Sequence, residues 1–318
     1  MEPRDAAVVG PVRAAVDGQA RVDQGGSYRG GRGRRRDRAG GGAYRKQWLN
    51  ERAELREQTR LNVERLAKAA EQLGADAPAV RLAGVYALAS LADDWPRGRQ
   101  NCIDVLCAYL RLYYVPDPPD ALPERRAWHG ERQLRHSITR IISARLREGA
   151  GPSWQGHDFD FTGAVFDGGE FEDARFTAGR VSFRNAQFRS GVVSFRGTVF
   201  AGAVVSFQDA RFADCMVSFE GAHVTAGAVN FDDAEFESGE VSFTDARFTG
   251  GALSFNAVFC GCLVAFTGAA FRGSDITFAG ARFRDGQVDL RDVADYRTPP
   301  LLDGQRTQDV FLPPGSPA

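Results

Sequence analysis

The second half of the chain alternates apolar and polar residues on a short, fixed period. Between about Phe159 and Leu290, each twelve-residue unit follows the form V-S-F-x-x-A-x-F-x-x-G-x. Its two apolar–polar–apolar segments have period two, so the polar residue should face away from its apolar neighbours. One deletion before Ala257 shifts the register, which resumes at Phe266. Self-similarity at a fixed short period predicts a solenoid.

Twelve residues are too few to enclose a core, so we expect two units to form one turn with four short faces. Corners of two and four residues should alternate. Glycine at the third position of the longer corner, as at Gly191 and Gly286, indicates a tight bend with positive φ. Turns stacked about 4.8 Å apart would give roughly five to five and a half turns and a rod on the order of 25 Å long. The predicted inner ladder consists of Phe183, Phe188, Phe195, Phe207, Phe212, Phe219, Phe231, Phe236, Phe243, Phe248, Phe255 and Phe278.

Residues 44–150 have the apolar periodicity of helices. Asp76 is expected to cap the second helix, because Pro78 fits a first helical turn. Short connections favour a small helical module that covers the first open coil of the solenoid. The predicted helices span residues 48–73, 80–95, 99–114 and 123–148.

The A-x-F segments, such as Ala210-Arg211-Phe212 and Ala246-Arg247-Phe248, resemble the pentapeptide-repeat family over about 130 residues. The resemblance implies a right-handed quadrilateral β-helix, although spacings of five and seven residues alternate here. The run from Val80 to Leu88 resembles a helical module that precedes such repeats in actinobacterial proteins. The expected fold class is therefore α+β in separate domains: an N-terminal helical module followed by a right-handed quadrilateral β-helix.

Four segments follow from this pattern: a disordered Arg/Gly-rich tail at 1–43, a four-helix module at 44–150, the solenoid at 157–290 and an extended tail at 291–318. Leu301, Leu302 and residues 310–312 are apolar enough to fold back over the last coil. The first tail could bind phosphate backbones weakly and without sequence specificity, or could be a solvated tail or a start assigned too early. Its candidate residues are Arg32, Arg34, Arg35, Arg36 and Arg38.

Charge is unevenly distributed although the net charge is −1. Residues 157–292 carry 19 acidic and 11 basic residues, whereas the segment before residue 151 is basic by about eight charges. The five scattered cysteines do not form a secreted disulfide framework. No signal peptide and no membrane-spanning segment are expected, which favours a cytoplasmic protein.

Catalytic chemistry is not evident. His129 and His136 lie seven residues apart on one predicted helix, which is too far for a shared metal ion, and His157 and His223 are interpreted as boundary or surface residues. Cys260 and Cys262 should share a corner column with Cys215, two coils and roughly 10 Å away. We therefore expect no catalytic residue, no metal site, no cofactor and no enzymatic activity.

The favoured function is a protein-interaction scaffold that binds an unidentified partner through solenoid faces. Alternatives are a DNA mimic that binds a type II topoisomerase, which the family resemblance suggests, and a scaffold tethered to nucleic acid by its N-terminal tail. Only the cluster around Asp232, Asp233, Glu235, Glu237 and Glu240 is strongly acidic, which weakens the mimic hypothesis. Stacking of free C-terminal coils would give a homodimer. The candidate interaction strip is Ser182, Ser194, Ser206, Ser218, Asn230, Ser242 and Ser254.

Overall fold

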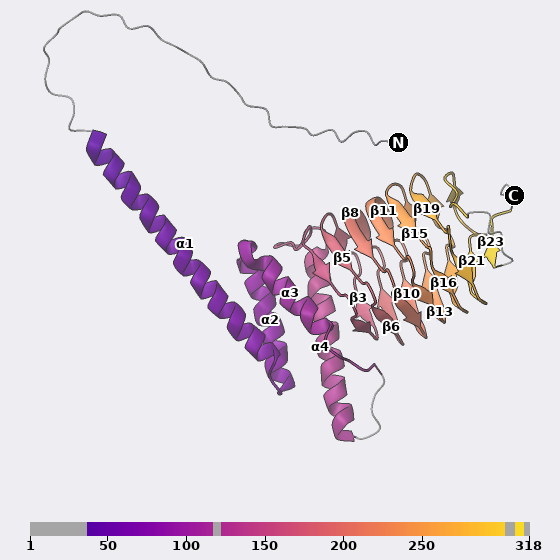
Figure 1. The fold of residues 1–318 in the computed structure, drawn as a ribbon, viewed down its shortest axis with the longest axis horizontal. Coiled ribbons are helices and arrows are strands. Elements are labelled where there is room, and N and C mark those ends of the chain that lie inside the picture. Colours follow the sequence, from indigo (N-terminus) through magenta and orange to yellow (C-terminus); the bar gives the residue numbers. More distant parts are fainter. Residues whose placement is uncertain (1–36, 117–121, 303–308, 315–318) are drawn as a thin grey trace, which may run out of the picture. The chain divides into compact units, whose positions relative to one another are not determined.

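The computed structural model of the chain describes residues 37–116, 122–302 and 309–314, and at 37–46 and 122–123 the backbone alone. A helical region precedes the strands (Figure 1). The chain divides into two compact units between Arg56 and Glu57, so the first part of α1 belongs to a different unit from the remaining elements. The helices are α1 (Asp37–Leu73), α2 (Pro78–Asp94), the 3₁₀ segment η1 (Pro96–Gly98), α3 (Arg99–Leu110) and α4 (Leu122–Leu146).

Helix ends differ from the predicted ends for local reasons. Helix α2 begins at Pro78, but its N-cap is Ala77 without a side-chain hydrogen bond, so the predicted cap at Asp76 is wrong. Helix α3 ends at Leu110 rather than near residue 114, and the Tyr114 hydroxyl instead donates a hydrogen bond to Asp167 in the first coil. Helix α1 begins at Asp37, which places Arg38 in a helix rather than in a disordered tail. The other tail arginines lie outside the described residues.

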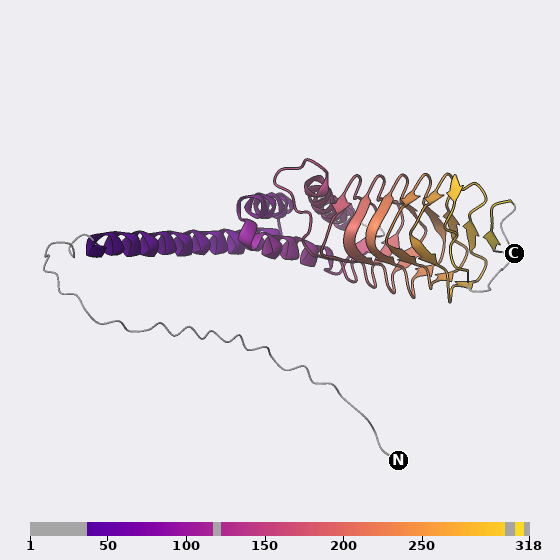
Figure 2. The same ribbon diagram turned by 90° about the horizontal axis from the view of Figure 1, so that it is seen from above.

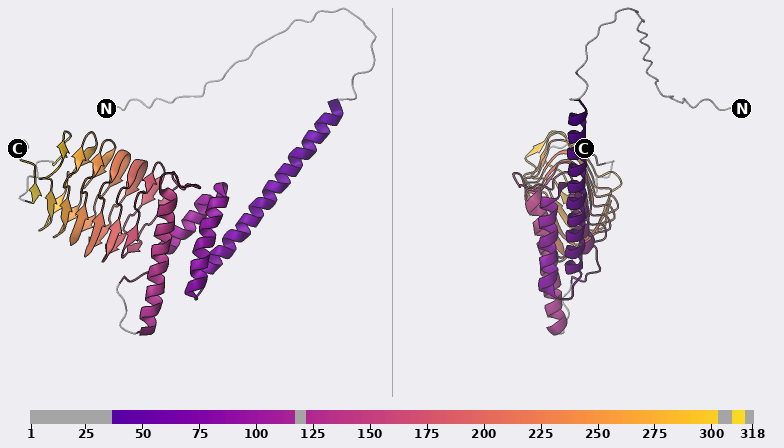
Figure 3. Two further views of the ribbon diagram at one scale, coloured as in Figure 1. Left: turned by 180° about the vertical axis from the view of Figure 1, so that it is seen from behind. Right: turned by 90° about the vertical axis from the view of Figure 1, so that its left-hand side faces the viewer.

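Residues from Phe159 onward form a parallel β-solenoid of about six turns, which confirms the predicted fold class. The strands stack coil upon coil from the first turn to the last (Figures 1 and 3). The first sheet contains β1 (Phe159–Asp160), β4 (Arg175–Phe176), β5 (Arg180–Ser182), β8 (Val199–Ser206), β11 (His223–Asn230), β14 (Arg247–Phe248), β15 (Ala252–Ser254), β18 (Ala270–Phe271), β19 (Asp275–Thr277) and β22 (Asp295–Tyr296). The second contains β3 (Gly169–Glu170), β7 (Val192–Ser194), β10 (Cys215–Ser218), β13 (Gly239–Ser242), β17 (Leu263–Ala265), β21 (Gln287–Asp289) and β23 (Val310–Phe311). The third contains β2 (Val165–Phe166), β6 (Gln187–Arg189), β9 (Arg211–Ala213), β12 (Glu235–Phe236), β16 (Val258–Phe259) and β20 (Arg282–Phe283).

The pairing register shows how the repeat builds a turn. Val181 pairs with Val205, Phe188 with Phe212 and Val193 with Val217, so each regular turn contains two repeat units. Four faces follow in chain order, and in the second coil they are 181–183, 186–188, 193–195 and 198–200. We call them the first, second, third and fourth faces. The first sheet covers the fourth and first faces, because the eight-residue strands β8 and β11 continue around the corner between them.

Stacked phenylalanine rings fill the interior. Phe207 lies parallel to Phe183 and Phe231, with ring centroids 4.7 Å apart in both pairs. It meets Phe195 and Phe219 of the third face edge to face at 5.9 Å and 6.1 Å. Parallel stacking follows from the spacing of coils, whereas edge-to-face contacts satisfy the ring quadrupoles across the core. Every phenylalanine of the predicted ladder is buried.

Two turns before Leu290 are shorter than the regular one. The deletion before Ala257 is absorbed in a corner where the Ala257 amide donates to the Phe255 carbonyl at 2.8 Å, whereas the regular corner joins Ala186 to Phe183 at 3.0 Å. A hydrogen bond from residue i+2 instead of i+3 closes this tighter turn. In the first coil, the corner between the second and third faces contains only Asp167 and Gly168 rather than four residues.

The regular two-residue corners place their second residue in the left-handed region. This position has φ of 54° at Asn185, 57° at Asp209 and 56° at Asp233. Asn and Asp tolerate this region, which explains why these residues or glycine recur there.

Gly286 differs from the prediction because the positive φ falls on Asp285, at 65°. A Cβ at Gly286 would lie 2.6 Å from the Phe259 Cβ, so lack of space explains this glycine.

The segment after Leu290 continues the coil instead of leaving it. Strand β22 pairs with β18, Leu301 bridges Thr277, and β23 pairs with β21. These additions extend the solenoid beyond the five to five and a half turns predicted from the repeat. Seen from above, the coils form successive loops up to this end (Figure 2). Leu302, Val310 and Leu312 are partly buried against the core.

Replacing Gly239 by alanine is expected to cost about 2–3 kcal/mol of unfolding free energy. Gly239 has φ of 89°, and an added Cβ would overlap the carbonyl oxygen of Cys215 in the preceding coil. Gly163 is the matched control, because its φ is 72° but nothing lies within 4 Å of an added Cβ. Gly163→Ala should cost only the backbone term of about 1 kcal/mol in urea denaturation. Equal losses in the two variants would contradict the close approach of the coils at Gly239.

Candidate interaction surfaces

The predicted serine strip is divided between two faces of the solenoid. Ser182 pairs with Ser206 on the first face, and that column continues through Asn230 to Ser254. Ser194, Ser218 and Ser242 pair with one another on the third face. Because alternate repeat units occupy the first and third faces of the turn, residues twelve apart cannot share a column. The structure therefore supplies two short polar strips, which we call the first-face strip and the third-face strip.

These polar residues also shape the corners that follow them. The hydroxyl oxygens of Ser206 and Ser218 accept the backbone N–H two residues later at 3.3 Å, and the Asn230 side-chain oxygen does so at 2.6 Å. Such local bonds favour turns. All members of both strips remain partly exposed. Turn formation thus explains in part why serine occupies these positions. The exposed part of each strip side chain is available for contact with a partner.

The first-face strip borders a surface that is uncharged over three successive corners. The corners between the fourth and first faces consist of Ala, Gly, Val and Thr at residues 201–204, 225–228 and 249–252. Val204 is half exposed there. Towards the C-terminal end, a shallow groove of about 400 Å³ is lined by Asn230, Ser254 and Thr277 of the first face and by Leu301, and here the surface acquires one charge at Asp275. An uncharged surface of small residues permits close approach of a partner backbone.

The acidic cluster on the solenoid is partly neutralised by neighbouring side chains. Arg211 pairs with Glu235 at 2.7 Å and with Glu237 at 3.2 Å. Asp232 accepts hydrogen bonds from Asn230 and Ser254. These contacts weaken the negative field that a mimic of a phosphate backbone would need.

The cysteines lie in the predicted column, two coils apart. Cys215 pairs with Gly239, and the next coil places Cys262 in the same column. Burial raises the pKa of Cys215 to about 11 and that of Cys262 to about 12, which keeps both thiols protonated and unreactive at neutral pH. Within the described part of the chain, no three His, Cys, Asp or Glu residues are grouped so that they could hold a metal ion.

The histidines have separate surroundings. His223 lies on the fourth face, where its Nε2 atom is 2.9 Å from the hydroxyl of Thr249 in a corner of the next coil, and burial together with Arg247 lowers its pKa. His157 Nδ1 lies 3.2 Å from the Trp154 carbonyl oxygen just before the first coil. His136 lies at the junction between α4 and the first coil, whereas His129 contacts Trp128 edge to face on the same helix.

A buried carboxylate fastens α4 to the first coil, and the sequence did not reveal it. The Oδ2 atom of Asp167 accepts hydrogen bonds from Tyr114 at 2.6 Å and from Arg132 Nε at 2.8 Å, while Oδ1 lies 3.0 Å from His136 Nε2. The Asp167 side chain is 4% exposed. We call this group the Asp167 clasp. The short corner at Asp167 and Gly168 makes room for it, because a Cβ at Gly168 would meet His136 at 3.2 Å.

Opposing effects set the charge of the clasp. Burial alone disfavours a charged Asp167, but hydrogen bonds from His136 and Tyr114 and the charge of Arg132 outweigh it, so the pKa of this carboxyl is lowered. Burial and the neighbouring carboxylate raise the pKa of Tyr114, which therefore remains a donor. The ion-paired carboxylate thus holds three side chains of the helical region on one corner of the solenoid.

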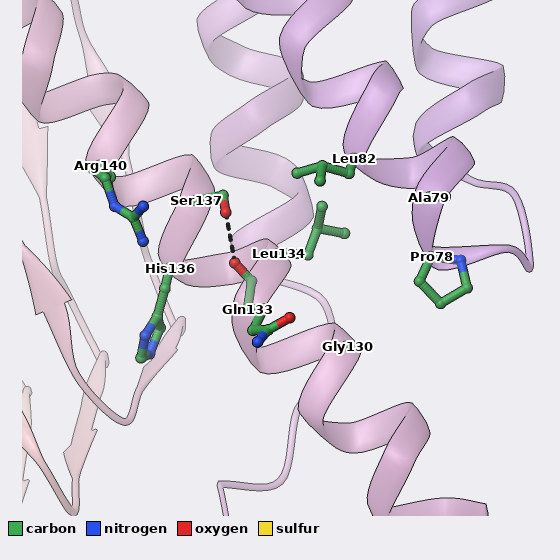
Figure 4. A pocket seen from close by; sticks show the side chains of 9 residues that line it. All are labelled: Pro78, Ala79, Leu82, Gly130, Gln133, Leu134, His136, Ser137 and Arg140. Atoms are coloured by element: carbon green, nitrogen blue, oxygen red, sulfur yellow. Dashed lines mark hydrogen bonds between the residues drawn. The ribbon is translucent and has the colours of Figure 1, made fainter.

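Helix α4 also forms a groove with α2, and His136 of the clasp is among the residues that line it. Leu82 of α2 and Leu134 of α4 face each other across it, while His136 and Arg140 extend from α4 away from them (Figure 4). The groove measures about 420 Å³, and Ser137 donates to the Gln133 carbonyl at 2.8 Å along its rim. Helix α4 therefore has an apolar side towards α2 and a polar side towards the first coil.

No family model, no curated protein and no solved structure matches this chain. Among the helices that the structure describes, none is long and apolar enough to cross a membrane.

Proposed function

We propose that this chain is a non-enzymatic, pentapeptide-repeat scaffold of the cytoplasm that binds a protein partner through the outer faces of its solenoid. The observation that carries the proposal is the pair of neutral polar strips on the first and third faces of a solenoid of about six turns. Stacked rings make the support rigid, so little ordering would be needed on binding.

The interior offers little chemistry for catalysis. Phenylalanine, valine and alanine dominate the buried positions of the solenoid, and its buried cysteines are held in the thiol form. The oxygens of the buried Asp167 carboxylate are occupied as hydrogen-bond acceptors by structural partners. Outer faces are therefore the favoured place for function, and the acidic cluster paired with Arg211 does not favour a DNA mimic.

A capture experiment with the full chain tests the proposal. Nuclease-treated lysate is passed over wild type, Ser206→Arg on the first face and Ser218→Arg on the third face. An arginine in the centre of a flat contact introduces a steric clash and an unpaired charge, so one variant should lose the partner by about tenfold or more. Circular dichroism should show that both variants stay folded, because these side chains point outward. A partner retained equally by both variants would argue against recognition by the strips.

A further inference from the structure

The segment between α3 and α4 exposes an unusual set of apolar side chains. Tyr113 is 93% exposed, Leu112 59% and Val115 42%, whereas Tyr114 between them is 7% exposed. Isolated exposed hydrophobic residues are common, but three within four positions form a patch of the kind found at binding surfaces. We call residues 111–116 the junction loop.

Fixed contacts hold the junction loop in place. The Tyr114 hydroxyl bonds Asp167 at 2.6 Å, and the Arg135 guanidinium lies 4.5 Å from the centre of the Tyr114 ring. Trp128 Nε1 donates to the Val115 carbonyl at 2.9 Å. Because these bonds order the backbone before any partner arrives, binding by Tyr113 would cost little conformational entropy. Exposed tyrosine on an ordered loop is a common centre of binding energy.

The junction loop faces the second face of the solenoid across a cleft of about 430 Å³. The opposite wall comes from Gly163 and Val165 of the first coil and from Gln187 and Arg189 of the second. Val165 and Gln187 are register partners, so this wall is a flat pair of outward side chains. The exposed apolar side chains of the cleft therefore come mainly from the junction loop, whereas the solenoid wall adds the polar side chains of Gln187 and Arg189.

The charges in this cleft are all positive. The residues that line it include Arg111 and Arg189 but no acidic side chain. Arg111 is paired with Asp160, whereas Arg189 makes no ion pair with any described residue. An anionic group on a partner would complement Arg189, and an aliphatic or aromatic side chain would fit beside Tyr113.

We propose that this cleft binds an acidic peptide segment of a partner protein, with one apolar side chain packed on Tyr113 and one carboxylate paired with Arg189. The proposal rests on the proposed scaffold function and assigns part of its recognition to the junction loop. A nucleic acid is disfavoured, because a single uncompensated arginine does not provide the several cations that a phosphate backbone recruits.

The test uses a phage-displayed library of random dodecapeptides, panned against the intact chain. Recovered peptides should combine Asp or Glu with Leu, Phe or Trp. In fluorescence anisotropy, Tyr113→Ala and Arg189→Glu should each raise the Kd by about tenfold or more. Replacing the acidic residue of the peptide by lysine should restore binding to Arg189→Glu but not to wild type.

Matched controls separate the cleft from general effects. Arg284 occupies the same corner position as Arg189 four coils later and is exposed, and Tyr86 is exposed on α2. Arg284→Glu and Tyr86→Ala should leave the Kd within about twofold. Three results would overturn the proposal. They are recovered peptides that are not enriched in Asp or Glu, a peptide Kd for Arg189→Glu equal to that of wild type, and binding of a dodecamer oligonucleotide in place of peptides. A protein partner lost from Ser206→Arg or Ser218→Arg but retained by Tyr113→Ala and Arg189→Glu would overturn only the cleft.

Discussion

Replacing Phe207 by alanine is expected to lower the free energy of unfolding by about 3–5 kcal/mol. Phe207 is fully buried and is stacked between Phe183 and Phe231. The change removes apolar burial and leaves a cavity in the middle of the ladder, where neighbouring coils fix the backbone and prevent collapse. Because each coil contacts only its neighbours, the defect should also reduce cooperativity.

Urea denaturation followed by circular dichroism measures this loss, and hydrogen exchange shows whether the neighbouring coils open first. Gln208→Ala is the control, because Gln208 follows Phe207 at a solvent-facing corner and should change stability by less than about 0.5 kcal/mol. A loss below about 1 kcal/mol for Phe207→Ala would contradict a close-packed interior at this position.

Replacing Asp167 by asparagine should cost about 2–4 kcal/mol at pH 7. The substitution removes the negative charge that Arg132 and His136 face. It also places a side-chain NH2 group, which cannot accept a hydrogen bond, next to the donors that faced the carboxylate. The partly exposed Arg132 can regain water, which places the loss below that of a fully buried pair. Hydrogen exchange should increase in α4 and in the first coil, and less in the later coils.

The lowered pKa of Asp167 also predicts how the stability difference between wild type and Asp167→Asn depends on pH. Because the pKa of Asp167 is lowered in the folded protein, its contribution to stability is complete above the unfolded value of about 3.9 and is lost as pH falls through the folded pKa. The stability gap between wild type and Asp167→Asn should therefore be constant near neutral pH and narrow below about pH 4. Asp160→Asn is the control, because this half-exposed carboxylate should contribute about 1 kcal/mol or less. A gap that stays constant into acid would show that the charge of Asp167 does not fasten the helices.

The repeat made most of the fold predictable. A twelve-residue period with phenylalanine at its centre determines the four-faced turn, and the deletion before Ala257 appears in the structure as one tighter corner. Ser206 and Ser218 hold the same position in successive repeat units, which suggests a single strip. Because two units make one turn, the period in fact implies that they lie on different faces. Asn185 and Asp209 carried a visible turn signal as well, since their corner position is occupied by Asn, Asp or Gly in most coils.

Other features depend on packing that no periodicity encodes. The clasp needs Tyr114, Arg132 and His136 to converge on Asp167 from two elements, and the only local sign is the five-residue spacing between Phe166 and Phe171. The continuation of the last coil depends on short apolar pieces, such as Val310 and Phe311, that have no repeat of their own. Exposure of Tyr113 likewise follows from the anchoring of its neighbour.

Disulfide formation between paired columns tests the geometry of the turn most directly. In a Cys260→Ser background, one variant carries Ser206→Cys with Asn230→Cys, and a second carries Ser206→Cys with Ser218→Cys. Ser206 and Asn230 are register partners in adjacent coils. Paired strands lie about 4.8 Å apart, which falls within the Cα separation of about 4.4–6.8 Å that a disulfide spans. Mild oxidation of dilute protein should therefore cross-link the first pair and leave the second pair reduced. Cross-linking of Ser206→Cys to Ser218→Cys, with none between the first pair, would contradict the four-faced turn and the two strips that rest on it.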